Sequence, residues 1–183
     1  MTAPSHFRTL SSPFAEVAVQ TDADGRVEKV FFCSGRDPRS VLAAGEGPGA
    51  ADSLVEDPPG RGPTAAAVAQ LLEYFAGERR SFDLELAPRG SRFQQQVWRY
   101  LAGIPFGETR SYGEIAEILG CPGGARAVGR ANATNPVAVV VPCHRVVGAD
   151  GSLTGYAGGL PIKKALLELE GWCGEPGQLR LDL

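Results

Sequence analysis

The chain has 183 residues, of which 43% are hydrophobic and 21% charged, and its formal net charge of −3 is that of an ordinary globular protein. No apolar segment approaches the length of a membrane span, and the N-terminal residues MTAPSHFRTL lack the basic and apolar parts of a secretory signal. We therefore expect a cytoplasmic protein that has no membrane partner.

The first half of the chain predicts a small α/β domain. Its elements in chain order are strands over residues 14–19 and 27–32, a loop over 34–63, a helix over 64–77 and a strand over 81–86. The pair Asp24-Gly25 between the first two strands is a strong hairpin signal, and Thr64 and Gly77 are the expected N-cap and C-terminal end of the helix. We expect residues 1–86 to act as a scaffold, because nothing in their pattern indicates chemistry.

The second half predicts a mainly helical domain over residues 87–171, followed by a tail over 172–183. Its elements in chain order are helices over 91–101, 111–120, 125–135 and 161–171, a strand over 136–142 and a glycine-rich loop over 148–159. Capping boxes at Ser91 and Ser111 begin the first two helices. The expected fold class is therefore a two-domain α+β protein, with a short strand leading to the residue that we expect to react.

The helices over 111–120 and 125–135 are joined by a short glycine-containing turn, which is the pattern of a helix-turn-helix. The second helix consists mostly of small residues, so that Arg126 and Arg130 project from a slim rod that can approach a narrow groove of DNA. It has few of the long polar side chains with which recognition helices read bases in the major groove. A close-packed helix whose arginines merely face water is the alternative interpretation.

The charge of the chain is unevenly distributed. Residues 1–88 carry 8 Lys and Arg against 13 Asp and Glu, whereas residues 89–171 carry 9 against 6. The positive excess in the second part indicates that any polyanion would bind there. Taken alone, this difference in charge between the two parts is explained equally well by a chance distribution of charged residues.

The four cysteines are far apart in the sequence and include no C-x-x-C pair: Cys33, Cys121, Cys143 and Cys173. A zinc site would need nearly all of these thiols together with His6 and His144, the two histidines of the chain, and would lack the usual paired spacing. We therefore expect no metal site. Most of the cysteines should be small buried hydrophobes in a reducing compartment.

Cys143 differs from the other cysteines because it follows the apolar run 136–142 and directly precedes His144. A free thiol has a pKa of about 8.5 and needs a base to form the nucleophilic thiolate at neutral pH. Such a base is usually held by a carboxylate or an amide, and Glu170 and Asn135 are candidates for this role. An inert core cysteine beside a surface histidine is the alternative, since adjacent side chains on a strand point to opposite faces.

Several long motifs occur in the same order and spacing as in one known family. They are FQQQVW, IPFGETRSYGEIA, ARAVGRAN, NPVAVVVPCHRVVG and TGYAGGLPIKKALLELEG, which together extend from Phe93 to Gly171. The sequence thereby resembles the O6-alkylguanine-DNA alkyltransferases, also called methylated-DNA–protein-cysteine methyltransferases. Residues 1–86 match that family only in rough outline.

The resemblance implies a reaction and a role for each catalytic residue. Cys143 would accept the alkyl group from O6 of guanine as a thioether, with His144 acting as its base through a bound water and Glu170 orienting His144. Asn135 would brace the turn before the strand, and Tyr112 would donate a proton toward N3 of the departing guanine. Because no second cysteine is placed to reverse the transfer, the protein would act once and would need no cofactor.

The resemblance also implies how DNA would bind. The helix over 125–135 would enter the minor groove of double-stranded DNA, and Arg126 would hold the space of the extruded nucleotide, which cannot react inside the base stack. The DNA-binding residues would be Ala125, Arg126, Ala127, Gly129 and Arg130. The pocket for the extruded base would be lined by Tyr112, Val146, Tyr156 and Ala157. We expect a monomer in solution that repairs O6-alkylguanine, chiefly O6-methylguanine.

Other functions are compatible with parts of this pattern. A non-enzymatic sensor of alkyl lesions with the same fold would lack the thiol that Cys143 supplies. A Cys-His hydrolase of another fold would leave the slim helix unexplained, and a helix-turn-helix transcription regulator would need more base-reading side chains. Ala157 stands where some relatives have serine, and we expect this smaller residue to favour bulkier alkyl groups.

Overall fold

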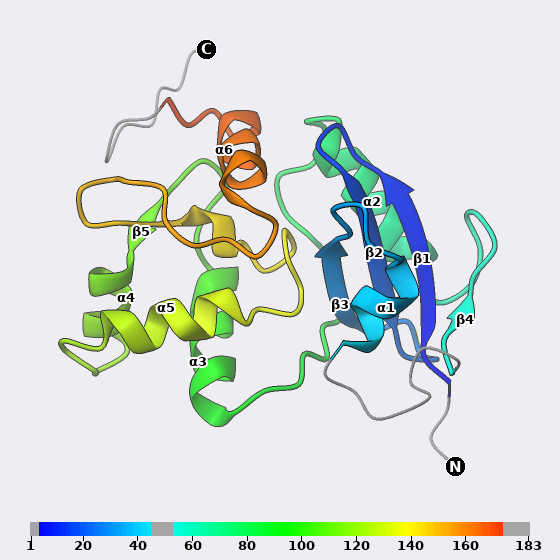
Figure 1. The fold of residues 1–183 in the computed structure, drawn as a ribbon, viewed down its shortest axis with the longest axis horizontal. Coiled ribbons are helices and arrows are strands. Elements are labelled where there is room, and N and C mark those ends of the chain that lie inside the picture. The colour runs from blue at the N-terminus through cyan, green and yellow to red at the C-terminus, as the bar shows by residue number, and fades with distance from the viewer. Residues whose placement is uncertain (1–3, 45–52, 174–183) are drawn as a thin grey trace. The chain divides into compact units, whose positions relative to one another are not determined.

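The computed structural model describes residues 4–44 and 53–173. The chain splits into two compact units, Met1–Arg89 and Gly90–Leu183 (Figure 1). Helices and strands occur in both, so the predicted two-domain α+β fold is confirmed. The division lies three residues after the boundary predicted between residues 86 and 87.

The predictions of a C-terminal tail and of no membrane span can be compared with the structure only over the described residues. Residues 174–183, which make up most of the predicted tail, lie outside the described residues. Within the described ranges, no helix is long and apolar enough to cross a membrane.

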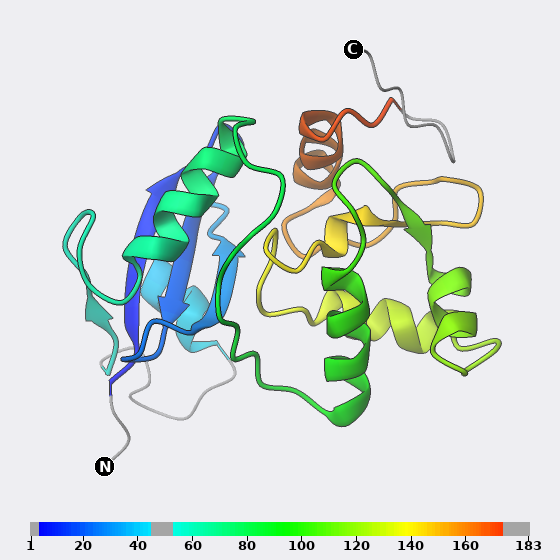
Figure 2. The same ribbon diagram turned by 180° about the vertical axis from the view of Figure 1, so that it is seen from behind.

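The N-terminal unit is a four-stranded sheet with a helix on each face. The strands lie in the order β3-β2-β1-β4, with β1 (His6–Ser11), β2 (Glu16–Thr21) and β3 (Val27–Phe32) antiparallel and β4 (Val55–Glu56) parallel to β1. Figures 1 and 2 show helix α1 (Pro38–Ala43) on one face of the sheet and helix α2 (Ala65–Phe75) on the other.

The predicted hairpin is present between β2 and β3. Gly25 takes up a φ of 84° in its turn, a conformation that glycine adopts without steric cost. Strand β3 has the predicted bounds, and β2 begins two residues later than predicted. Strand β1 was not predicted, because its buried residues Phe7 and Leu10 are three positions apart and do not show the alternation of buried and exposed residues that is typical of a strand.

Two further predictions for this unit are wrong. Residues 81–86 do not form a strand, because only Leu86 bridges Val27 and the segment has no longer ladder to join. The region 34–63 is not entirely a loop, since it contains α1 and β4. Helix α1 is held by a local signal, the carboxylate of Asp37, which accepts a hydrogen bond from Ser40 N at 2.8 Å.

Thr64 precedes α2, as predicted, but its side chain does not cap the helix. Its Oγ1 donates instead to Asp57 Oδ2 at 2.8 Å, and its backbone N donates to the same oxygen at 2.9 Å. His6 Nδ1 lies 2.8 Å from Asp57 Oδ1. The buried Asp57 carboxylate therefore joins β1 to the start of α2.

The C-terminal unit is mainly helical. Its elements in chain order are α3 (Arg92–Ala102), β5 (Arg110–Ser111), α4 (Tyr112–Ile118), α5 (Ala125–Ala133), the 3-10 helix η1 (Cys143–Arg145), β6 (Val146–Val147) and α6 (Leu160–Leu169). Both predicted capping boxes are present, with the hydroxyls of Ser91 and Ser111 accepting hydrogen bonds from the backbone N–H of Gln94 and Glu114. The four predicted helices are confirmed, each with ends within two residues of the prediction.

The strand predicted over residues 136–142 is wrong, because this run folds as a compact buried turn. Val139 has a φ of 71°, which β-branched residues rarely adopt, and Val141 N donates to Val137 O at 2.9 Å. Residues 137–141 are all buried, so their backbone groups need partners within the protein. The short strand β6 follows η1 instead and pairs in parallel with β5.

Candidate active site and nucleic-acid interface

The turn over residues 137–141 leads to Cys143, the first residue of η1. Asn135 holds both sides of this turn. Its Oδ1 accepts a hydrogen bond from Val137 N at 3.0 Å, and its Nδ2 donates to Val141 O at 2.8 Å. Because Asn135 is buried, these bonds do not compete with water, and the backbone before the thiol is held in one conformation.

His144 and Glu170 form a buried pair next to this thiol. Cys143 is 5% exposed and His144 is fully buried. His144 Nε2 lies 2.9 Å from Oε1 of Glu170, the residue that caps the C-terminus of α6. The fold therefore brings together three of the predicted catalytic residues, although 26 positions separate the histidine from the carboxylate.

Arg145 completes this network, although the sequence prediction gave it no role. Its Nε donates to Glu170 Oε2 and its Nη2 to Glu170 Oε1, both at 2.8 Å, in the two-pronged geometry that suits guanidinium and carboxylate. Its Nη1 donates to Ile104 O, and Gly107 N donates to Glu170 Oε2 at 3.1 Å. The signal was available, because a buried carboxylate needs a cation and Arg145 follows the Cys-His pair directly.

The charges of this network favour a neutral His144 and an ionised Glu170. Burial alone would raise the pKa of Glu170, but the hydrogen bonds and charges of His144 and Arg145 lower this pKa far below its ordinary range. Burial lowers the pKa of His144, and the attraction of Glu170 offsets this effect only in part. A neutral imidazole that donates its Nε2 proton to Glu170 has Nδ1 as its acceptor atom.

The Cys143 thiol keeps its proton at neutral pH. Burial raises its pKa, whereas the Asn135 side chain, the charge of Lys163 and the backbone N–H groups of Cys143 and His144 lower it without overcoming the burial. Proximity to a histidine and an arginine therefore does not itself produce a thiolate. The site needs an acceptor that takes the proton during the reaction.

Lys163 is a second residue that sequence reasoning missed. It is fully buried on α6, and its Nζ donates to Val146 O at 2.5 Å and to Thr154 O at 2.6 Å. Burial lowers the pKa of Lys163 to about 8, and the charge of Cys143 acts in the opposite direction. Two adjacent lysines in a helix suggest a solvent-exposed face. Lys163, however, lies four and seven positions before the buried residues Leu167 and Glu170, and this spacing places it on the same inward face of the helix.

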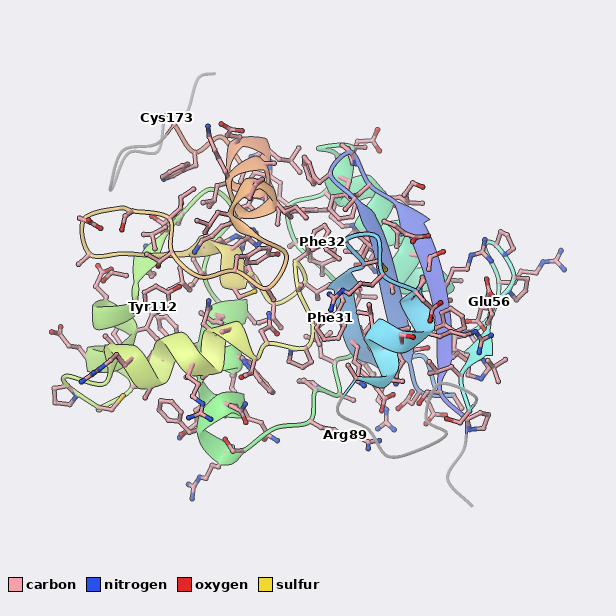
Figure 3. All side chains as sticks on the ribbon, viewed as in Figure 1. Phe31, Phe32, Glu56, Arg89, Tyr112 and Cys173 are labelled. Carbon is pink, nitrogen blue, oxygen red and sulfur yellow. The ribbon has the colours of Figure 1, made fainter. Side chains whose placement is uncertain are left out.

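Tyr112, the first residue of α4, lies beside α5 (Figure 3). A Cβ atom added at Gly129 of α5 would be 3.7 Å from its ring, which is an ordinary van der Waals distance, so the ring packs against this helix. Its hydroxyl donates to Thr154 O at 3.5 Å, and burial raises its pKa. Tyr112 is thus a protonated phenol that shares an acceptor with Lys163.

Helix α5 has one exposed face and one buried face. Arg126, Ala127 and Arg130 are exposed, whereas Ala125 and Gly129 are half-buried. Val128, Ala131 and Asn132 face the interior. All five residues predicted to bind DNA are thus accessible in part or in full, and the two arginines are on the same exposed face.

Of the residues predicted to line a pocket, Tyr112 lies on α4 and the other three lie on β6 and on the loop over 148–159. Val146 is fully buried, Tyr156 is half-buried and Ala157 is exposed. Because Lys163 donates to both Val146 O and Thr154 O, the loop backbone is attached to the strand that follows η1.

Residues 4–44 and 53–173 contain no group of three His, Cys, Asp or Glu side chains that could hold a metal ion. His6 is paired with Asp57, as described above. Cys33 is buried in the apolar core of the N-terminal unit, beside Phe7 and Ala18.

Residues 92–172 match the family described as 6-O-methylguanine DNA methyltransferase, DNA binding domain. The chain is 67% identical over 106 residues to the methylated-DNA–protein-cysteine methyltransferase of Mycolicibacterium paratuberculosis, covering 58% of this chain and 64% of that protein. It is 62% identical over 112 residues to the protein of the same name from Mycobacterium tuberculosis, covering 61% and 68%. The alignment thus spans slightly less than two thirds of the length of the Mycolicibacterium paratuberculosis protein.

Solved structures match almost the whole chain. The O6-methylguanine methyltransferase of Mycobacterium tuberculosis has a TM-score of 0.78 and 45% identity, covering 97% of this chain and 98% of that one. The OGT of the same organism in complex with DNA has a TM-score of 0.77 and 45% identity, covering 94% and 96%. The resemblance found in the sequence motifs is confirmed, and the chain belongs to the methylated-DNA–protein-cysteine methyltransferase family.

Proposed function

We propose that this chain repairs duplex DNA by transferring the alkyl group of O6-alkylguanine, chiefly O6-methylguanine, to Sγ of Cys143 in a single turnover. The observation that carries the proposal is the buried network in which the thiol precedes a His144 that is paired with Glu170 at 2.9 Å. Membership of the family supports the same reaction.

The first step is removal of the thiol proton. Burial keeps Cys143 protonated, and the neutral His144 offers Nδ1 as an acceptor because its Nε2 proton is directed at Glu170. The proton passes through a bound water to Nδ1, and the Glu170 carboxylate stabilises the imidazolium that forms. Arg145 keeps Glu170 ionised and fixed, so Glu170 orients the base without taking up the proton.

The second step breaks the bond between O6 and the alkyl carbon while the bond between that carbon and Sγ forms. The electron pair of the broken bond moves onto the purine, whose developing negative charge must be neutralised. Tyr112 is a protonated phenol beside α5, and we assign it the donation of a proton to N3 of the leaving guanine. The departing base is then neutral, and Cys143 retains the alkyl group as a thioether.

The reaction cannot be repeated on the same molecule. A thioether has no labile S–S bond, so thiol exchange, which regenerates other oxidised or blocked cysteines, does not restore it. The alkyl group comes from the lesion itself, and the proposed reaction therefore needs no cofactor. One molecule of protein repairs one lesion.

DNA would be bound through α5. The exposed Arg126 and Arg130 project from a helix of small residues, which suits entry into the minor groove. An alkylated base inside the stack is inaccessible to a buried thiol, so the nucleotide must be turned out of the duplex, and Arg126 would occupy the space that it leaves. Ala125, Ala127 and Gly129 would permit the close approach of the helix to the sugar–phosphate backbone.

The extruded base would lie against Val146, Tyr156 and Ala157. Val146 and the loop over 148–159 are linked by Lys163, so the wall of this pocket is held by backbone contacts. The small side chain of Ala157 leaves room beside the alkyl group, which favours bulkier groups. We further propose that the protein acts as a monomer in the cytoplasm, where its four cysteines stay reduced.

The decisive experiment incubates the protein with duplex DNA that carries one O6-methylguanine and determines the mass of the intact protein. We expect a stoichiometric gain of one methylene group on the peptide that contains Cys143. Cys143→Ser should abolish the gain, and Cys121→Ser, which changes a cysteine outside the network, should retain it. Tight binding without a change of mass would instead indicate a non-enzymatic lesion sensor.

A further inference from the structure

Two buried asparagines flank the end of α5, and they differ in how their amide groups are satisfied. Asn135 uses both ends of its amide, accepting from Val137 N and donating to Val141 O. Asn132 is 2% exposed and uses only its nitrogen: Nδ2 donates to the backbone oxygen of Cys143 at 3.3 Å. Within the described residues, Asn132 Oδ1 is buried and accepts no hydrogen bond.

An amide with a buried, unsatisfied oxygen is a poor choice if the residue only fills space. Leucine has a similar shape and carries no polar atom that burial would penalise. The single bond that Asn132 forms is also longer than the usual 2.9–3.0 Å. The contribution of Asn132 to folding stability is therefore small or negative, and a role in the reaction would account for an amide at this position.

The location of Asn132 suggests what that role is. It lies on the buried face of α5, two residues after Arg130 on the exposed face. Ala131, the residue before it, accepts a hydrogen bond from Trp98 Nε1 of α3 at 2.8 Å, so this end of the helix is firmly attached. One side chain thus joins the helix that carries Arg126 and Arg130 directly to the backbone of the nucleophile.

We propose that Asn132 is a positioning residue that couples contact between α5 and duplex DNA to the placement of Cys143. This inference rests on the proposed function. A small displacement of α5 on DNA moves the amide against the Cys143 carbonyl and so shifts η1, which holds the thiol and His144. The weak resting bond lets this contact tighten when DNA is bound.

The test measures alkylation of Cys143 by free O6-methylguanine base, with and without undamaged duplex DNA. Coupling between sites typically amounts to a factor of about 5–150, so DNA should accelerate the wild-type reaction at least about fivefold. In Asn132→Leu this ratio should fall to about one, while affinity for DNA and the melting temperature are not reduced. Thr134→Val, which also removes a polar side chain near the end of α5, should keep the wild-type ratio.

Other results would overturn the inference. Coupling through Asn132 would be excluded if the ratio of the rates with and without DNA were the same in Asn132→Leu as in the wild type. It would also be excluded if DNA did not accelerate the wild-type reaction. A lower melting temperature with equal losses on free base and on duplex would assign Asn132 a purely structural role. Should Asn132→Leu not fold, Asn132→Met, whose flexible side chain adapts to the same space, gives the same comparison. Absence of any alkylation of wild-type Cys143 would instead refute the proposed function.

Discussion

Each unit of the molecule buries a carboxylate paired with a histidine, and the two pairs differ in what surrounds them. His6 Nδ1 lies 2.8 Å from Asp57 Oδ1, and His144 Nε2 lies 2.9 Å from Glu170 Oε1. Both carboxyl groups have lowered pKa values because neighbouring donors stabilise their charge. The geometry of a histidine–carboxylate pair therefore does not by itself identify an active site.

The surroundings make the difference. The other donors to the Asp57 side chain come from Thr64, so this carboxylate joins backbone segments of the N-terminal unit. At Glu170 the paired histidine is His144, the residue that directly follows Cys143 in η1. The side chain of His144 is fully buried, whereas that of His6 is 19% exposed. A shared element of structure thus stabilises the fold in one unit and, in our proposal, prepares a nucleophile in the other.

Replacing each histidine by glutamine tests this difference most strongly. We expect His144→Gln to slow alkyl transfer from duplex O6-methylguanine by about 100-fold or more, because general-base catalysis typically contributes factors of about 10² to 10⁴. His6→Gln should leave the rate unchanged. Single-turnover rates followed by intact mass measure both variants. An equal loss of rate in His6→Gln would show that the N-terminal pair takes part in the reaction.

A glycine lies against each carboxylate residue, and alanine at these positions should separate stability from activity. A Cβ at Gly62 would be 2.5 Å from the Asp57 carboxyl carbon, and one at Gly107 would be 2.9 Å from Glu170 O, both at positive φ. Each alanine variant should lose about 2–3 kcal/mol of unfolding free energy, against about 1 kcal/mol for Gly120→Ala, whose Cβ would meet no atom within 4 Å.

Urea unfolding measures these losses, and transfer rates of the folded fraction complete the comparison. Only Gly107→Ala should also slow the reaction, because Gly107 N donates to Glu170 Oε2. Equal rates in Gly62→Ala and Gly107→Ala would mean that small shifts of Glu170 do not matter to catalysis.

Lys163 and its neighbour Lys164 provide a matched pair for testing the electrostatics of the site. Lys163 is buried and its charge lowers the pKa of Cys143, whereas Lys164 is exposed beside Glu168. In Lys163→Met, alkylation of Cys143 by iodoacetamide at pH 7.5 should slow about tenfold, which corresponds to a rise of about one unit in the thiol pKa. The full pH–rate profile should shift to higher pH in this variant and remain in place in Lys164→Met.

The smallest expected effect concerns the stability of the N-terminal unit in acid. A carboxyl group whose pKa is lowered on folding stabilises the protein above its unfolded pKa of about 3.9, and this contribution disappears as the pH falls through the folded value. We expect Asp57→Asn to lower the unfolding free energy by about 1 kcal/mol at pH 7. The difference in unfolding free energy between the variant and the wild type should disappear as the pH falls below about 4. A gap independent of pH would indicate that lost shape, not charge, weakens the variant.

Local signals explain which parts of the fold could be predicted. The capping boxes at Ser91 and Ser111 and the turn at Gly25 depend on residues a few positions apart, and all three are present. The run over 136–142 has the composition of a strand, but its residues 137–141 are all buried and the chain bends at Val139, so tertiary packing overrides β propensity. Residues 81–86 alternate as a strand should, yet have only one partner residue to bridge.

The candidate site shows the same limit. Cys143, His144 and Glu170 were predicted because their motifs are long and distinctive, and the fold brings all three together. Lys163 was missed because lysine is usually exposed. No local pattern reveals that two backbone carbonyls, those of Val146 and Thr154, accept hydrogen bonds from its ammonium group. The role proposed for Asn132 likewise depends on a contact with a residue eleven positions away.

The carbonyl of Thr154 accepts hydrogen bonds from both Tyr112 and Lys163. This loop is consequently attached through a main-chain carbonyl, a group that every amino acid supplies whatever its side chain. In the proposed function this loop lies against the extruded base, so we expect changes at its exposed positions to alter which alkyl groups are accepted without weakening this attachment. Libraries confined to such positions, with Tyr112 and Lys163 retained, would therefore be the place to select variants that accept bulkier alkyl groups.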